Sequence, residues 1–152
     1  MLTASGACFA LIRRFEGFRA APYRCPAGVP TIGCGSTRYA DGRPVALTDP
    51  PITEAVAVEI MQAAVREYEA AVNRYARVDL QQHEFDALVS FAYNAGAQNL
   101  RTSTLLRKLN AGDRIAAAAE FDRWVNCGGQ RVPGLIKRRA AERAMFKGAP
   151  QI

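Results

Sequence analysis

The chain has 152 residues, of which 49% are hydrophobic and 22% charged. This length and composition are typical of one globular domain that buries its core without a metal or disulfide staple. The excess of Lys and Arg over Asp and Glu, 20 against 14, gives a formal charge of +6. Such a charge favours encounter with a polyanion, either nucleic acid, an acidic membrane surface or an anionic cell-wall polymer, and does not choose among them.

The side chains that metal sites and hydrolytic triads need are scarce. The four cysteines, Cys8, Cys25, Cys34 and Cys127, form no CxxC pair, and His83 is the one histidine of the sequence. Zinc ligands usually come in close pairs, so a zinc site is not expected. A Ser-His-Asp hydrolase is not expected either, because His83 would have to be its base and no nucleophile-elbow motif accompanies it.

The longest apolar run, from Ala7 to Ile12, is far too short to span a bilayer, and Arg13 and Arg14 follow it at once. We therefore expect no transmembrane helix. The basic, apolar and small-residue layout of a secretory signal is also not seen before this run.

The first predicted element is a helix that begins near Thr3 or Ser5 and ends before Gly17. Its apolar positions recur at three- and four-residue spacing: Cys8, Leu11, Ile12 and Phe15. Glu16 is therefore expected at the C-terminal end of this helix.

The pattern changes between Pro22 and Val45, where Pro, Gly and β-branched residues dominate. Turn sequences stand at Pro26-Ala27-Gly28 and at Asp41-Gly42. We predict a small antiparallel sheet of two or three short strands here.

After Asp49-Pro50-Pro51 the sequence is helical to its end, with no linker that would separate two independent domains. The predicted helices run from about Thr53 to Ala76, Gln81 to Ala95, Ser103 to Leu109, Asp113 to Trp124 and Gly134 to Phe146, with a Gly-rich loop from Cys127 to Pro133. Inward positions of the fourth helix are expected at Ile115, Ala118, Phe121 and Trp124. In the last helix Lys137, Arg138, Arg139 and Arg143 are expected to form a solvated face with Glu142.

Glu16 is the first candidate for chemistry. A carboxyl group at a helix C-terminus faces the negative end of the helix dipole, and Phe15 and Phe18 beside it would reduce its hydration. Both effects favour the protonated acid, which can donate a proton to a leaving oxygen. The alternative is a solvated Glu16 that pairs with Arg13 or Arg19.

Glu16 is followed after eight residues by Cys25 and after five more by Thr31, with Ile-Gly-Cys-Gly next. This spacing resembles the active-site signature of phage-type lysozymes, glycoside hydrolase family 24, in which the middle residue is Asp or, in a subset of phage endolysins, Cys. Further blocks resemble the family in the same order: Ala87 to Gly96, Ser103 to Leu106, Leu109 to Asp113, Gly134-Leu135, Arg138-Arg139 and Glu142-Arg143.

The resemblance implies an α+β, lysozyme-like fold with the active-site cleft between two lobes. A small antiparallel β lobe would cover about residues 18–50, and a larger helical lobe about residues 53–148 together with the N-terminal helix. Residues 1–152 would form a single catalytic domain.

The resemblance also assigns roles to the three signature residues. Glu16 would be the general acid on the glycosidic oxygen, Cys25 would stand where an Asp places or activates water, and Thr31 would help to position that water. An ordinary thiol is mostly protonated at neutral pH, so Cys25 would need a lowered pKa, for which Arg24 or Arg131 is a candidate cause. A buried Cys25, or one in a disulfide bond with Cys34, stays open as the alternative.

Three further residues are expected at the saccharide. Tyr93 and Asn94 fall on the helix where the family lines its cleft, and Arg131 could reach Glu16 or the sugar from its loop. The chain departs from the family at Cys34-Gly35-Ser36, where many members have a Gly-His pair that braces the sheet lobe.

The implied reaction is hydrolysis of the β-1,4 bond between N-acetylmuramic acid and N-acetylglucosamine in peptidoglycan, without a cofactor. The resemblance implies a monomeric phage endolysin without nucleic-acid binding or stable membrane insertion, made in the host cytoplasm and released to the wall. Release would use a holin-type pore if no upstream segment is missing. A bacterial muramidase toxin would use the same domain. A lytic transglycosylase that needs only Glu16, and a non-catalytic basic wall-binding module, are the alternatives.

Overall fold

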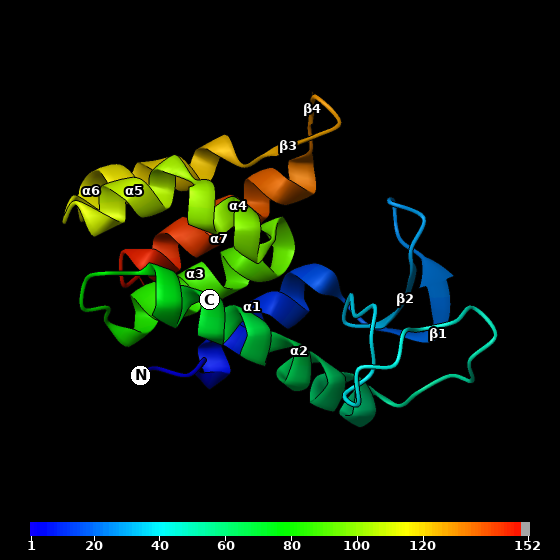
Figure 1. The fold of residues 1–152 in the computed structure, drawn as a ribbon. Coiled ribbons are helices and arrows are strands. Elements are labelled where there is room, and N and C mark those ends of the chain that lie inside the picture. The colour runs from blue at the N-terminus through cyan, green and yellow to red at the C-terminus, as the bar shows by residue number, and fades with distance from the viewer. Residues whose placement is uncertain (150–152) are drawn as a thin grey trace. The chain divides into compact units, whose positions relative to one another are not determined.

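The structure, a computed structural model, describes residues 1–149, which form helices and two small antiparallel sheets (Figure 1). Its Cα positions group into two compact units, Ile12–Glu67 and a second unit made of Met1–Leu11 with Tyr68–Ile152. The helices α1 (Gly6–Glu16) and α2 (Glu54–Tyr75) supply residues to both units. The predicted α+β class is confirmed.

The unit Ile12–Glu67 contains the larger of the two sheets. Strand β1 (Arg19–Arg24) pairs antiparallel with β2 (Pro30–Gly33), and isolated bridges join Ile32 to Ser36 and Arg38 to Pro44. Two strands form, as predicted, and the possible third strand is reduced to these bridges. The register of β1 against β2 shifts between Arg19 and Tyr23, which is the mark of a β-bulge.

This unit has its own small core. Its fully or nearly buried apolar residues are Ile12, Ile32, Cys34, Val45, Ala57, Ile60, Met61 and Val65. The loop that follows the bridges is closed by Asp49, whose carboxylate accepts hydrogen bonds from the Tyr39 hydroxyl at 2.7 Å and the Ala46 N–H at 2.9 Å. These bonds, the one from Ala46 first, lower the pKa of Asp49.

The second unit is helical and is built around α3 (Gln82–Ala95), in which every residue from Glu84 to Ala92 is buried. Short helices follow: α4 (Ala97–Thr102), α5 (Thr104–Asn110), α6 (Arg114–Glu120) and the 3-10 turn η1 (Phe121–Arg123). The last helix, α7 (Pro133–Phe146), packs against α3.

Two predicted N-caps are confirmed in this unit. The Ser103 hydroxyl accepts a hydrogen bond from the Leu106 N–H, and the Asp113 carboxylate accepts one from the Ala116 N–H, each at 3.0 Å. Helix α4 was not predicted, because six residues are too few to show a helical period. The expected Gly-rich loop contains a two-residue hairpin, β3 (Asn126–Cys127) with β4 (Gln130–Arg131).

The predicted solvated face of α7 is wrong for Arg138, Arg139 and Glu142, which are 3%, 1% and 0% exposed. Both arginines pair with the Glu142 carboxylate inside the unit, which offsets one of the two positive charges. The Ser90 hydroxyl of α3 also donates to that carboxylate at 2.6 Å. Charged groups are tolerated inside a protein only when they are paired and hydrogen-bonded, as these are.

The prediction for α6 is wrong at Ile115, whose side chain is 88% exposed. The buried residues of this helix are Ala117, Ala118 and Glu120, and the buried Phe121 follows in η1. Ile115 stands two residues before Ala117, about 200° away around the helix, and therefore points outward.

Within residues 1–149, no helix combines the length and the apolar character that crossing a bilayer would take.

Candidate functional site

Glu16 is the last residue of α1, as predicted, and its side chain is half-buried. The helix stops because Gly17 adopts a left-handed φ of 70°, and the Gly17 N–H still donates to the Arg13 carbonyl at 2.9 Å. One turn earlier, the Arg13 guanidinium is paired with Glu54 of α2. The contacts of Gly17 and Arg13 thus fix the helix end that carries the Glu16 carboxyl group.

The main chain at Gly35 lies directly against the Glu16 carboxylate. A Cβ built on Gly35 would be 3.1 Å from the Glu16 carboxyl carbon and would overlap one of its oxygens, and Gly35 itself has a φ of 77°. A tight hairpin holds Gly35 there, since Ile32 and Ser36 exchange main-chain hydrogen bonds of 2.8 and 3.0 Å. No residue with a side chain fits this position without moving Glu16.

The side chain of Ser36 weakens this hairpin. Ser36 is 4% exposed, and among the described residues its hydroxyl oxygen has no hydrogen-bond partner. An unsatisfied buried hydroxyl costs about 1–3 kcal/mol of stability. The hairpin beside Glu16 is therefore stabilised less than a fully bonded one would be.

Cys25 stands at the tip of the β1–β2 hairpin and is partly exposed. Its N–H donates to the Val29 carbonyl at 3.1 Å, and the Gly28 N–H donates back to the Cys25 carbonyl at 2.7 Å. Main-chain N–H groups, that of Val29 first and that of Ala27 next, lower the pKa of the Cys25 thiol. The lowered pKa was predicted from a neighbouring arginine, whereas these N–H groups are its main cause.

Thr31 lies on β2 directly opposite Tyr23 of β1, and is only 2% exposed. Opposed residues of an antiparallel pair point to the same face, and Cys25, two residues after Tyr23, follows the same alternation. The Thr31 hydroxyl donates its proton to the Val29 carbonyl at 2.8 Å. The Thr31 side chain also lowers the Cys25 pKa, by less than the main-chain N–H groups of Val29 and Ala27 do.

Tyr23 is a site residue that the sequence analysis missed. Burial raises the pKa of its phenol, and the charge of Glu16 raises it further, with smaller contributions from Cys25 and Cys34. The guanidinium of Arg19, 4.0 Å from the ring centre, acts in the opposite direction. Its place two residues before Cys25 on a predicted strand was the signal that could have found it.

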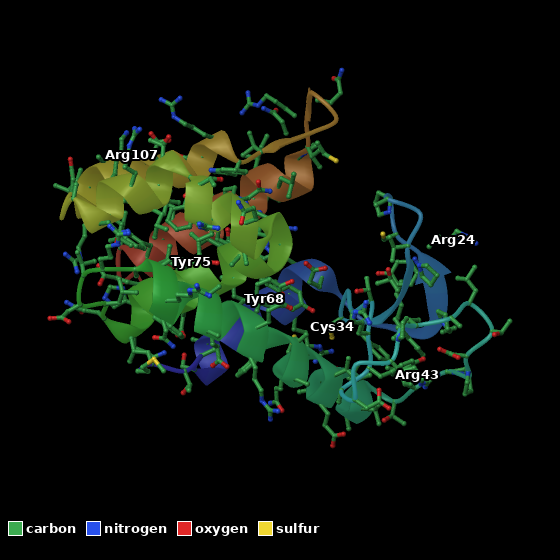
Figure 2. All side chains as sticks on the ribbon, viewed as in Figure 1. Arg24, Cys34, Arg43, Tyr68, Tyr75 and Arg107 are labelled. Carbon is green, nitrogen blue, oxygen red and sulfur yellow. The ribbon has the colours of Figure 1, made fainter. Side chains whose placement is uncertain are left out.

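The second thiol of this unit, Cys34, is labelled in Figure 2 and differs from Cys25 in its burial. Cys34 is buried, and burial raises the pKa of its thiol, with Arg13 opposing this shift and Glu16 adding to it. All four cysteines are free thiols. This structure has no disulfide between Cys25 and Cys34, and a reduced Cys25 stays a prediction.

The three residues expected at the saccharide all belong to the helical unit. Tyr93 packs edge-on against Tyr68, with ring centres 5.5 Å apart, and the exposed Asn94 accepts a hydrogen bond from the buried Arg139. Arg131 is exposed on β4. Their roles stay predictions.

Within residues 1–149, no group of three or more His, Cys, Asp or Glu side chains is arranged to hold a metal ion.

The chain is similar to a known protein family, to several phage proteins and to solved structures. The sequence model of the phage lysozyme family matches residues 13–142. The chain is 40% identical over 143 residues to an endolysin of Acyrthosiphon pisum secondary endosymbiont phage 1, covering 91% of this chain and 94% of that protein. It is 41% identical to an endolysin of Bacillus phage B103, of which it spans 51%. Its fold matches the endolysin from Escherichia coli O157:H7 phage FAHEc1 with a TM-score of 0.88 at 35% identity, over 99% of this chain and 98% of that one.

The opposite states of Cys25 and Cys34 predict a difference in reactivity. Because the thiolate is the nucleophile and the pKa of Cys25 is lowered, we expect Cys25 to react with iodoacetamide faster than Cys8 and Cys34, whose pKa values burial raises. The midpoint of its rate against pH should lie below that of N-acetylcysteine. Peptide mass spectrometry after short labelling pulses measures both, and a Cys25 midpoint at or above that of the model thiol would contradict the assignment.

Proposed function

The chain belongs to the phage lysozyme family and is a glycoside hydrolase of peptidoglycan, and we propose that Glu16 and Cys25 carry its reaction. The bond cleaved is the β-1,4 linkage between N-acetylmuramic acid and N-acetylglucosamine, and its cleavage lyses the bacterial host. One observation supports this choice of residues above the others. All three signature residues lie in the same unit, where Glu16 ends α1 against the main chain of Gly35 and the β1–β2 hairpin carries Cys25 and the buried Thr31.

In the proposed reaction Glu16 donates its proton to the glycosidic oxygen as the bond from that oxygen to the anomeric carbon breaks. A water attacks the anomeric carbon and gives up a proton to the Cys25 thiolate. Atoms balance, since the leaving sugar keeps the Glu16 proton as a new hydroxyl and the water oxygen stays on the muramic acid. Cys25 therefore does the work that a carboxylate does elsewhere, and main-chain N–H groups keep its thiolate available.

Thr31 has the proposed task of positioning the attacking water. Its hydroxyl proton is engaged by the Val29 carbonyl, so its oxygen faces the site as an acceptor for a water proton. Its burial and its place opposite Tyr23 fix where that acceptor lies.

We extend the proposal to the saccharide and to the whole chain. Tyr93, Asn94 and Arg131 would contact the glycan, with Arg139 orienting the Asn94 amide. Residues 1–152 would act as one monomeric catalytic domain that uses no cofactor and binds no nucleic acid, and the charge of +6 would favour encounter with the anionic wall. Synthesis in the host cytoplasm followed by release to the wall, through a holin-type pore, completes the proposal.

Replacing the carboxyl group of Glu16 with an amide tests its role as the acid directly. We expect Glu16→Gln to slow the clearing of a peptidoglycan suspension by about 10² to 10⁴-fold, which is the usual contribution of a general acid. Glu59→Gln, the same change at an exposed position of α2, should clear at the wild-type rate. Full clearing by folded Glu16→Gln would remove Glu16 from the reaction. Mass spectrometry of the wild-type digest adds the chemistry, because anhydro-muramic ends would show transglycosylation instead of hydrolysis.

Two substitutions at Cys25 test whether the thiol stands in for a carboxylate. Cys25→Asp supplies an ionised group of similar size and should keep substantial activity, whereas Cys25→Ser cannot ionise near neutral pH and should lose about 10²-fold or more. The initial rate of clearing compares the two, with circular dichroism to show that both are folded. A folded, inactive Cys25→Asp beside an active Cys25→Ser would reverse the assignment.

A further inference from the structure

A basic hollow lies in the helical unit, where the end of α2 meets α4 and α5. It consists of two overlapping cavities of about 420 and 330 Å³, which share Arg77, Arg101, Leu106 and Asn110 among their lining residues. Arg74 and Tyr75 line the first cavity and Arg107 lines the second. Figure 2 labels Tyr75 and Arg107, which stand on α2 and α5.

The hollow gathers positive charge without any acid. Its four arginines, Arg74, Arg77, Arg101 and Arg107, are exposed, and no Asp or Glu lines either cavity. Among the ion pairs formed by the described residues, none includes one of these four guanidinium groups. Other cations of the unit, such as Lys108 and Arg114, do pair with carboxylates. The four like charges repel one another, and their N–H donors face solvent. A bound anion would reduce the repulsion and accept hydrogen bonds from these donors.

The floor of the hollow is held in place by hydrogen bonds. The Asn110 side chain accepts from the Arg77 N–H at 2.7 Å and donates to the Tyr75 carbonyl at 3.0 Å, which ties α5 to the segment after α2. The guanidinium groups of Arg74 and Arg101 lie 5.9 and 5.8 Å from the centre of the Tyr75 ring. The main chain that carries these arginines is therefore held in place, which reduces the conformational entropy lost when a ligand binds.

We infer that this hollow binds a compact ligand carrying two or more phosphate groups. Each guanidinium offers a planar fork of donors that matches phosphate oxygens, and four forks exceed what a single carboxylate can use. The concave shape favours a small group that enters over a flat anionic surface that passes across it. The phosphates can come from a soluble compound or from a headgroup or polymer of the bacterial envelope, and Glu16 is not among the residues that line the hollow.

Isothermal titration calorimetry with sodium tripolyphosphate, on the full chain, tests the inference. We expect Arg101→Gln/Arg107→Gln to weaken binding by about tenfold or more, because two charged hydrogen-bonding forks are lost. The matched control, Arg66→Gln/Lys147→Gln, removes the same charge from exposed residues that line neither cavity, and should bind within about twofold of wild type by long-range screening alone. Equal weakening in the two variants, or no binding by wild type, would overturn the inference.

Two further measurements separate the ligand source and the catalytic site. Vesicles that contain cardiolipin, whose headgroup carries two phosphates, support a headgroup as the source if they bind the wild type and are released by tripolyphosphate, whereas tripolyphosphate binding without vesicle binding supports a soluble one. If the chain binds vesicles but does not bind tripolyphosphate, and tripolyphosphate does not release the vesicles, the inference is overturned. Glu16→Gln should bind tripolyphosphate as tightly as wild type, and weaker binding by that variant would place the ligand elsewhere and overturn it as well.

Discussion

At Gly35 the main chain passes so close to the Glu16 carboxylate that one added methyl group would overlap its oxygen. This contact depends on two separate pieces of local structure. Helix α1 must end at Glu16, which Gly17 ensures, and the hairpin after β2 must fold back between Ile32 and Ser36. The proposed acid is thus held between a helix end and a main-chain turn, both inside the unit Ile12–Glu67.

The same unit contains two thiols whose pKa values shift in opposite directions. Cys25 is partly exposed in a turn whose N–H groups lower its pKa, whereas Cys34, nine residues on, is buried and has a raised pKa. Neither effect needs a neighbouring metal or a dedicated base. Main-chain N–H groups at Cys25 and burial at Cys34 separate a thiol that can ionise from one that stays a neutral part of the core.

Much of this arrangement could be predicted from the sequence. The helix that ends at Glu16, the sheet after it and the caps at Ser103 and Asp113 follow from local patterns of apolar, Gly and capping residues. The spacing of Glu16, Cys25 and Thr31 indicated the family before any fold was known, and the comparisons confirm that family.

What could not be predicted depends on contacts between distant residues. Arg138 and Glu142 have the sequence pattern of a solvated helix face, and only their pairing with each other and with Ser90 explains their burial. The main-chain cause of the Cys25 pKa and the approach of Gly35 to Glu16 have no sequence signature of their own. The basic hollow likewise draws its arginines from α2, α4 and α5 and from the segment after α2.

The most direct test of this account compares two glycine substitutions by their rate of peptidoglycan clearing. Gly35 and Gly42 both have a positive φ, of 77° and 88°, so an alanine strains the main chain at either position, but a Cβ at Gly42 meets nothing within 4 Å. Because Gly35→Ala must displace the Glu16 carboxylate as well, we expect it to lose about a hundredfold in rate, as small misplacements of catalytic groups do. Gly42→Ala should keep nearly the full rate. Equal rates for the two folded variants would contradict the claim that the hairpin main chain positions the catalytic acid.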